Sequence, residues 1–134
     1  MDRPALRLTD ARQALTTLFE LCNLPLPTDI ERDAAIQRFE YSFETVWKAA
    51  QQVLLMEGME ANSPRSAIRL SRNVGLLTDE QAEDGMRMLT DRNLTSHTYK
   101  SALAKEIFSR LAGHARLLDS WLNMLESRLK ENDT

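Results

Sequence analysis

Apolar residues recur every three or four positions along most of this chain, which is the spacing that places them on one face of an α-helix. Between about residues 5 and 22 the repeat consists of Leu8, Ala11, Leu15, Leu18 and Cys22. This pattern predicts a helix with one buried face, which the Pro25 and Pro27 pair ends. Cys22 belongs to the repeat, so we interpret it as a small buried side chain rather than as a reactive thiol.

A second and longer helix is predicted to begin after Thr28. Thr28 and Glu31 have the spacing of a capping box, in which the side chain of each binds the backbone N–H of the other. The apolar face then continues over about thirty residues to Gly58. The helix is predicted to end there, because glycine readily adopts the left-handed conformation found at helix ends. Its members are Ile36, Phe39, Phe43, Val46, Trp47, Ala50, Val53 and Leu54.

Three charged residues, Glu40, Glu44 and Lys48, share another face of this predicted helix. The spacing of Glu44 and Lys48 favours an ordinary ion pair on an exposed helix surface. The alternative is that Glu40 or Glu44 faces the polar segment at residues 92–99, which is described below.

A short third helix is predicted to start at Pro64, because Ser63 can cap it and proline lacks the N–H that a first turn leaves unpaired. Its arginines Arg65, Arg69 and Arg72 are spaced four and three apart and therefore form a one-sided basic stripe. This stripe is either a surface that contacts phosphate groups or an ordinary solvated face.

A fourth helix is predicted from a second capping box, formed by Thr78 and Gln81. The spacing of the apolar residues that follow predicts an inner face. Its members are Ala82, Met86 and Leu89.

The most regular apolar row of the chain predicts a long C-terminal helix. It consists of Leu103, Ile107, Leu111, Ala115, Leu118, Leu122, Leu125 and Leu129. Trp121 and Phe108 flank the row and widen it beyond the area that one neighbouring helix covers, which predicts a subunit interface as well as a core. The residues after Leu129 are expected to fray.

Composition supports an all-α protein with one domain spanning residues 1–134 and a core over about 5–129. The 134 residues include only 4 glycines and 4 prolines, and aromatic residues make up 6%. A net charge of −3 argues against a general nucleic-acid binder, so any contact with RNA must be local. One cysteine excludes an internal disulfide, and no run is long and apolar enough to span a membrane, so we expect a cytoplasmic protein.

The segment Arg92–Tyr99 carries more chemically active side chains than any other part of the chain, including a guanidinium, an imidazole and a phenol. On one unbroken helix Arg92 and His97 would lie roughly 140° apart, on different faces. The hydroxyl residues between them compete with helical hydrogen bonding, so we predict that the helix ends here and that both side chains turn toward a common point.

An arginine and a histidine at one point provide two requirements of RNA cleavage. Imidazole transfers protons near neutral pH, and guanidinium stabilises the charge that grows on a phosphate. Asn93 could position a phosphate or a base. The structural alternative is a helix junction in which Arg92 pairs with Asp91 or a carbonyl group and His97 is a satisfied polar residue. The two histidines, His97 and His114, lack neighbours at ligand spacing, so we expect no metal and no cofactor.

The spacing within residues 92–99 resembles the R-x4-H-x-Y signature of the HEPN family, in the branch encoded beside minimal nucleotidyltransferases (MNT). Further segments resemble the same branch in the same order, namely residues 37–44 with Trp47 and Lys48, residues 62–65 and residues 75–77. The resemblance extends over roughly residues 5 to 128.

This resemblance implies an up-down antiparallel bundle of four long helices and one short helix, paired as a homodimer whose two motifs meet in a composite cleft. It implies a metal-independent endoribonuclease toxin acting on tRNA or another structured RNA, with Arg92 and His97 as catalytic residues, followed and supported by Asn93. Its MNT partner would be an antitoxin that transfers AMP to Tyr99. The alternative implied by an older description of the branch is a non-catalytic substrate-binding subunit of a nucleotidyltransferase.

Overall fold

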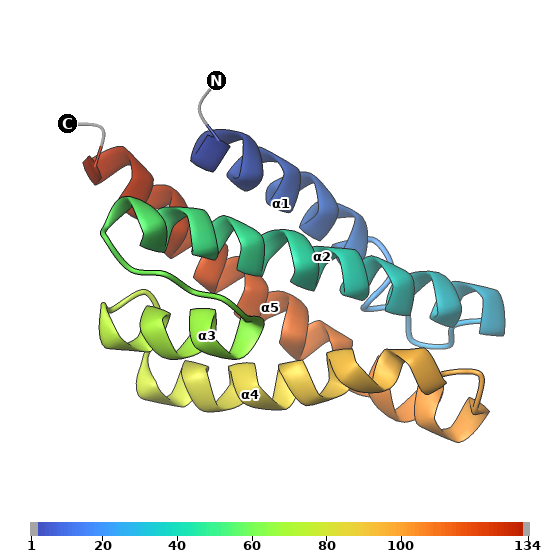
Figure 1. Cartoon of the computed structure of the whole chain (residues 1–134). Helices are drawn as coiled ribbons and strands as arrows, with labels where there is room; N and C mark the ends of the chain where they lie inside the picture. The colour runs from blue at the N-terminus through green and yellow to red at the C-terminus, as the bar shows by residue number, and fades with distance from the viewer. Residues whose placement is uncertain (1–2, 133–134) are drawn as a thin grey trace.

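The computed structural model describes residues 3–132, which form α-helices and one 3₁₀ turn, with no β-strand in that range (Figure 1). In chain order the elements are α1 (Arg3–Phe19), α2 (Asp29–Met56), α3 (Pro64–Asn73), α4 (Asp79–Leu94), the 3₁₀ turn η1 (Thr95–His97) and α5 (Ser101–Asn132). The α3 helix has 10 residues, and the other four α-helices have between 16 and 32. The predicted all-α bundle of four long helices and one short helix is therefore confirmed.

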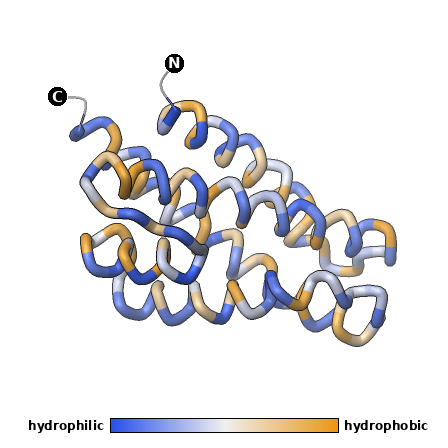
Figure 2. Tube along the Cα trace, in the orientation of Figure 1, coloured by the Kyte–Doolittle hydropathy of each residue, from blue (hydrophilic) through white to orange (hydrophobic). Residues whose placement is uncertain are grey.

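The long helices α2 and α5 run through the middle of the bundle, and both contact α1. The short α3 packs against α2 and α4, and α4 also contacts α5. Figure 1 shows α1 on one side of α2 and the α3–α4 pair on the other. Apolar and polar positions are interspersed along every helix (Figure 2), and the fully buried apolar side chains come from all of them, so one continuous core joins the helices.

The helix starts follow the local sequence closely. The Thr28 side chain accepts a hydrogen bond from the Glu31 N–H at 3.1 Å, and the Thr28 N–H donates to the Glu31 carboxylate at 2.9 Å. Thr78 and Gln81 form the second predicted capping box, and Ser63 caps α3 ahead of Pro64. These predictions are confirmed because a cap depends on residues that are adjacent in the chain.

The first helix ends earlier than predicted, at Phe19 rather than at the Pro25 and Pro27 pair. A turn follows, in which the Cys22 N–H donates to the Leu18 carbonyl at 3.0 Å. Cys22 is still buried beneath this turn, which confirms its interpretation as a core residue, and burial raises the pKa of its thiol.

The inner face of α4 is wider than predicted. Ala82 and Leu89 are buried as expected, but Met86 is only half-buried, and Met88 is fully buried instead. The difference arises because α4 packs against both α3 and α5, so it buries more than one row of side chains.

Trp121 belongs to the core of a single chain. It is fully buried, and its indole N–H donates to the Ser71 hydroxyl of α3 at 3.0 Å. The prediction that Trp121 widens α5 for a second subunit is therefore wrong, because α3 covers it. The α5 helix continues past Leu129 to Asn132, while positions 133 and 134 of the predicted frayed tail lie outside the described residues.

None of the helices within residues 3–132 combines the length and the apolar character that a membrane span requires.

Candidate functional site

The segment Arg92–Tyr99 lies where α4 gives way to α5 (Figure 1). The α4 helix ends at Leu94, the 3₁₀ turn follows, and α5 begins at Ser101. The Thr95 hydroxyl lies 2.7 Å from the Arg92 carbonyl, and the Thr98 hydroxyl donates to the Thr95 carbonyl at 2.9 Å. The predicted helix break between Arg92 and His97 is confirmed, with hydroxyl side chains bonded to the backbone at the junction.

Arg92 is half-buried and is held against α2. Its Nη1 lies 3.1 Å from the Thr95 hydroxyl and 3.7 Å from Glu40 Oε2. The Thr95 hydroxyl is also 3.1 Å from that Glu40 oxygen, so the three side chains form one polar cluster. The Arg92 Nε is buried and donates to no group within residues 3–132. This geometry fixes the guanidinium at the end of α4.

The alternative that Glu40 faces the polar segment is correct, whereas Glu44 behaves as an ordinary surface residue. Glu44 Oε1 lies 3.3 Å from Lys48 Nζ, which is the ion pair predicted from their spacing. The two glutamates therefore have different roles although they lie one turn apart on α2.

His97 and Tyr99 are exposed on the far side of the break. Their ring centroids are 6.4 Å apart in an edge-on arrangement, and the Tyr99 side chain is 78% exposed. The Lys100 ammonium lies 5.9 Å from the centre of the Tyr99 ring. Asn93 is also exposed, in the last turn of α4. No hydrogen bond or ion pair within residues 3–132 joins Arg92 to His97, so one chain does not link the two side chains directly.

The arginines Arg65, Arg69 and Arg72 all lie exposed on α3, as their spacing predicts. They line one side of a cleft of about 200 Å³ that Glu83 and Met86 of α4 also line. Arg72 is 4.0 Å from Asp79, and Arg65 Nη1 is 3.9 Å from the Met86 sulfur. The basic stripe is thus an exposed surface beside α4, with Asp79 near Arg72 and Glu83 in the lining of the same cleft.

Asp91, which directly precedes Arg92, is the centre of a buried polar cluster. Its carboxylate accepts hydrogen bonds from Arg110 Nε at 2.8 Å and Arg110 Nη2 at 2.9 Å. His114 Nε2 lies 2.7 Å from the same carboxylate. The structural alternative in which Arg92 pairs with Asp91 is therefore wrong, because Asp91 is bonded to α5.

Burial of Asp91 opposes its ionisation, but the hydrogen bonds from Arg110 and His114 outweigh this effect and lower the pKa of Asp91. In turn, the hydrogen bond to Asp91 raises the pKa of Arg110. The ion pair is therefore retained throughout the neutral range.

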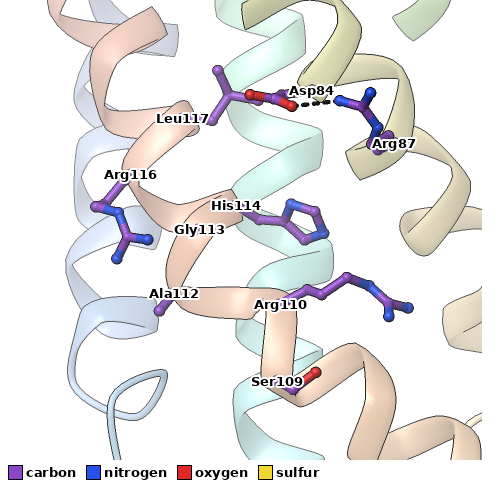
Figure 3. A pocket seen from close by; sticks show the side chains of 9 residues that line it. All are labelled: Asp84, Arg87, Ser109, Arg110, Ala112, Gly113, His114, Arg116 and Leu117. Carbon is purple, nitrogen blue, oxygen red and sulfur yellow. Dashed lines mark hydrogen bonds and ion pairs between the residues drawn. The ribbon is translucent and has the colours of Figure 1, made fainter.

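The same cluster reaches α2 through His114. The His114 ring stacks on Phe39 with centroids 5.3 Å apart and planes at 23°. Figure 3 shows His114 and Arg110 extending from α5 toward α4. In the sequence, His114 is a polar residue next to the apolar row of the last helix. That position is the signal that could have indicated a buried side chain with a hydrogen-bond partner.

Side chains of the metal-binding types do not gather in groups of three or more anywhere in residues 3–132.

These features define a class of protein: an all-α bundle in which a polar segment between two antiparallel helices presents an anchored arginine and an exposed histidine and tyrosine. The family model for proteins described as "nucleotidyltransferase substrate binding protein like" matches residues 6–129, and the chain belongs to this family. No curated protein matches the chain.

Solved structures that resemble this one include the following two. A protein from Thermus thermophilus is 53% identical, with a TM-score of 0.84 over 86% of this chain and 98% of that one. A mutant of the toxin–antitoxin complex MntA–HpeT is 12% identical, with a TM-score of 0.76 over 92% of this chain and 97% of that one. The second likeness concerns the fold alone.

Proposed function

We propose that this protein is the HEPN toxin of a HEPN–MNT toxin–antitoxin pair and acts as a metal-independent endoribonuclease on tRNA or another structured RNA. The observation that carries the proposal is the placement of the R-x4-H-x-Y segment. Arg92 is anchored by Glu40 and Thr95 at the end of α4, while His97 and Tyr99 are exposed just beyond the helix break. A held guanidinium and an accessible imidazole are two groups that cleavage of a phosphodiester requires.

In the proposed reaction His97 takes the proton of a ribose 2′-hydroxyl, and the 2′-oxygen forms a bond to phosphorus. The bond from phosphorus to the 5′-oxygen breaks, and the same His97, now protonated, gives its proton to that oxygen. The products are a 2′,3′-cyclic phosphate and a 5′-hydroxyl. Arg92 stabilises the negative charge that grows on the phosphate oxygens.

The proposed site is composite and forms in a homodimer, with Arg92 of one copy beside His97 of the other. Two observations support this arrangement: no direct bond joins the two residues within residues 3–132, and His97 is exposed. Asn93 and the stripe of Arg65, Arg69 and Arg72 would contact the RNA. They provide local positive charge in a protein with a net charge of −3.

The partner nucleotidyltransferase would silence the toxin by transferring AMP to Tyr99. Tyr99 is 78% exposed and its ring lies beside His97, so the added phosphate and base would occupy the space that RNA must enter. After co-expression with that enzyme, intact-mass measurement should find AMP on the wild-type protein and none on Tyr99→Phe. AMP on Tyr99→Phe at the wild-type level would contradict this assignment.

The ribonuclease proposal is tested by incubating the purified protein with RNA in the presence of EDTA. We expect cleavage that leaves 2′,3′-cyclic phosphate ends and a loss of at least ~100-fold in His97→Ala, which removes the proton-transfer group. Lys105→Ala, which removes an exposed cation from α5, is the control and should cleave normally. Undiminished cleavage by His97→Ala, with an unchanged helical circular dichroism spectrum, would refute the proposal.

A second candidate function is a non-catalytic substrate-binding subunit of a nucleotidyltransferase. The family description favours it, as does the ion pair with Glu40, which partly neutralises Arg92. This candidate predicts no RNA cleavage at any protein concentration. It predicts instead a stable complex with the enzyme and a change in the enzyme's nucleotide affinity that is lost in Arg92→Ala.

A further inference from the structure

Asp91 and Arg92 are consecutive residues in the last turn of α4, and each is bound to a different helix. The Asp91 carboxylate is bound to Arg110 and His114 of α5, whereas the Arg92 guanidinium lies against Glu40 of α2. Helix ends fray when nothing holds them, because their last carbonyl groups lack intrahelical partners. Here the final turn of α4 is held from two sides.

The contacts of Asp91 and Arg92 are connected to each other through neighbouring residues of α2 and α5. His114, which binds Asp91, stacks on Phe39, and Phe39 is the residue before Glu40. Glu40 in turn lies 3.7 Å from Arg92. The contact of Asp91 with α5 and the contact of Arg92 with α2 are therefore connected through His114 and Phe39.

The Asp91 attachment is the more rigid of the two. The Asp91 side chain is 6% exposed and accepts a forked pair of hydrogen bonds from Arg110, together with the bond to His114. In contrast, the Arg92 and Glu40 side chains are 31% and 36% exposed, and their closest approach is 3.7 Å. Forked, charge-assisted hydrogen bonds fix orientation as well as distance.

We infer that Asp91 is a positioning residue: through its bonds to Arg110 and His114 it sets the place of the Arg92 guanidinium in the site. The expected effect on the rate of RNA cleavage rests on the proposed function, whereas the expected effect on the position of the Arg92 guanidinium does not. A displacement of about 1 Å in a group that stabilises a transition state is enough to slow a reaction by about 100-fold.

The test compares Asp91→Asn with a matched control, Glu57→Gln. Glu57 also carries a carboxylate that joins two helices, through an ion pair with Arg128 of α5 at 2.8 Å, but it is the residue that caps the C-terminal end of α2 and has no hydrogen bond or ion pair with residues 91–99. In the RNA cleavage assay we expect Asp91→Asn to lower kcat by between about 10-fold and 100-fold with KM unchanged. Glu57→Gln should leave both constants at their wild-type values.

A spectroscopic readout separates this inference from the ribonuclease proposal. The Nε–H signal of Arg92 can be assigned in a ¹H–¹⁵N spectrum by its absence in Arg92→Lys. We expect this signal to shift and its hydrogen exchange to accelerate in Asp91→Asn, but not in Glu57→Gln. If wild-type protein cleaves no RNA, the proposed function fails while this measurement still decides the inference.

An unchanged Arg92 signal in Asp91→Asn overturns the inference, and so does an unchanged kcat where the wild-type protein is active. If Asp91→Asn does not fold, Arg110→Lys takes its place, because lysine keeps the charge but cannot form the fork. Arg110→Lys should change kcat and the Arg92 Nε–H signal in the same direction, but by less. Wild-type values of both quantities in this variant would also overturn the inference.

Discussion

At the scale of single residues, two carboxylates explain how the polar segment is held. Glu40 reaches Arg92 and Thr95 from α2, while Asp91 is bonded to Arg110 and His114 of α5. The first of these contacts is partly open to solvent and the second is buried. Their contributions to stability should therefore differ.

We predict that Asp91→Asn lowers the free energy of unfolding by about 2 kcal/mol at pH 7. This is the size expected for losing charge-assisted hydrogen bonds, since Arg110 is partly exposed and can regain water. The lowered pKa of Asp91 means that its stabilisation is present above the unfolded pKa, about 4, and is lost as pH falls through the folded pKa.

Urea denaturation of Asp91→Asn and wild-type protein at pH 7 and near pH 3 checks this prediction, with the difference expected to shrink at the lower pH. Asp84→Asn is the control, because the Asp84–Arg87 pair is exposed and its loss should change stability by less than ~0.5 kcal/mol. An equal loss for Asp91→Asn at both pH values would contradict the assignment of the buried ion pair.

The sequence identifies Arg92, His97 and Tyr99 as one segment because the signal is local. It does not identify the Asp91 cluster, since Arg110 and His114 lie 19 and 23 positions away and only the fold brings them to Asp91. The sequence suggests a pairing of Arg92 with Asp91 because spacing along the chain indicates only partners that are close in sequence.

At the scale of helices, two glycines, one in α4 and one in α5, distinguish the effect of helix propensity on stability from the effect of close packing. A Cβ atom on Gly85 would lie 3.2 Å from Ile68 Cγ2, in a fully buried part of the α3–α4 contact. A Cβ atom on Gly113 would meet only Arg116 Nη2 at 3.8 Å. Alanine gains about 1 kcal/mol over glycine inside a helix when nothing opposes it.

We therefore predict that Gly113→Ala raises the free energy of unfolding by about 1 kcal/mol, while Gly85→Ala gains nothing or loses stability. The two variants make the same chemical change within helices of one protein, so each serves as the control for the other. Denaturant titration of both variants measures the difference. An equal gain in the two would mean that α3 and α4 are not in close contact at Gly85.

Helix starts could be predicted from the sequence because caps are local, as at Thr28, Ser63 and Thr78. The end of α1 could not, because a turn after Phe19 buries Cys22 before the prolines are reached. Nor could the partner of Trp121, since Ser71 lies 50 positions away in the chain. Amphipathic pattern predicts which face is covered, and only the packing of the whole bundle decides what covers it.

At the scale of the whole molecule, an acidic chain is proposed to act on an acidic substrate. The net charge of −3 is compatible with this role only if positive charge is concentrated locally, and the arginines of α3 are concentrated in this way. The fold is shared with a toxin–antitoxin complex at 12% identity, so the proposal rests on the residues of the site rather than on the fold.

The central claim is that Arg92 of one copy and His97 of another form one ribonuclease site, and mixing two inactive variants tests it most directly. Arg92→Ala and His97→Ala should each fail to cleave RNA alone. After unfolding and refolding together, mixed dimers contain one intact pair, so activity should return to roughly a quarter of the wild-type level. No recovery in dimers shown to be mixed, with wild-type protein active in parallel, would contradict the composite site.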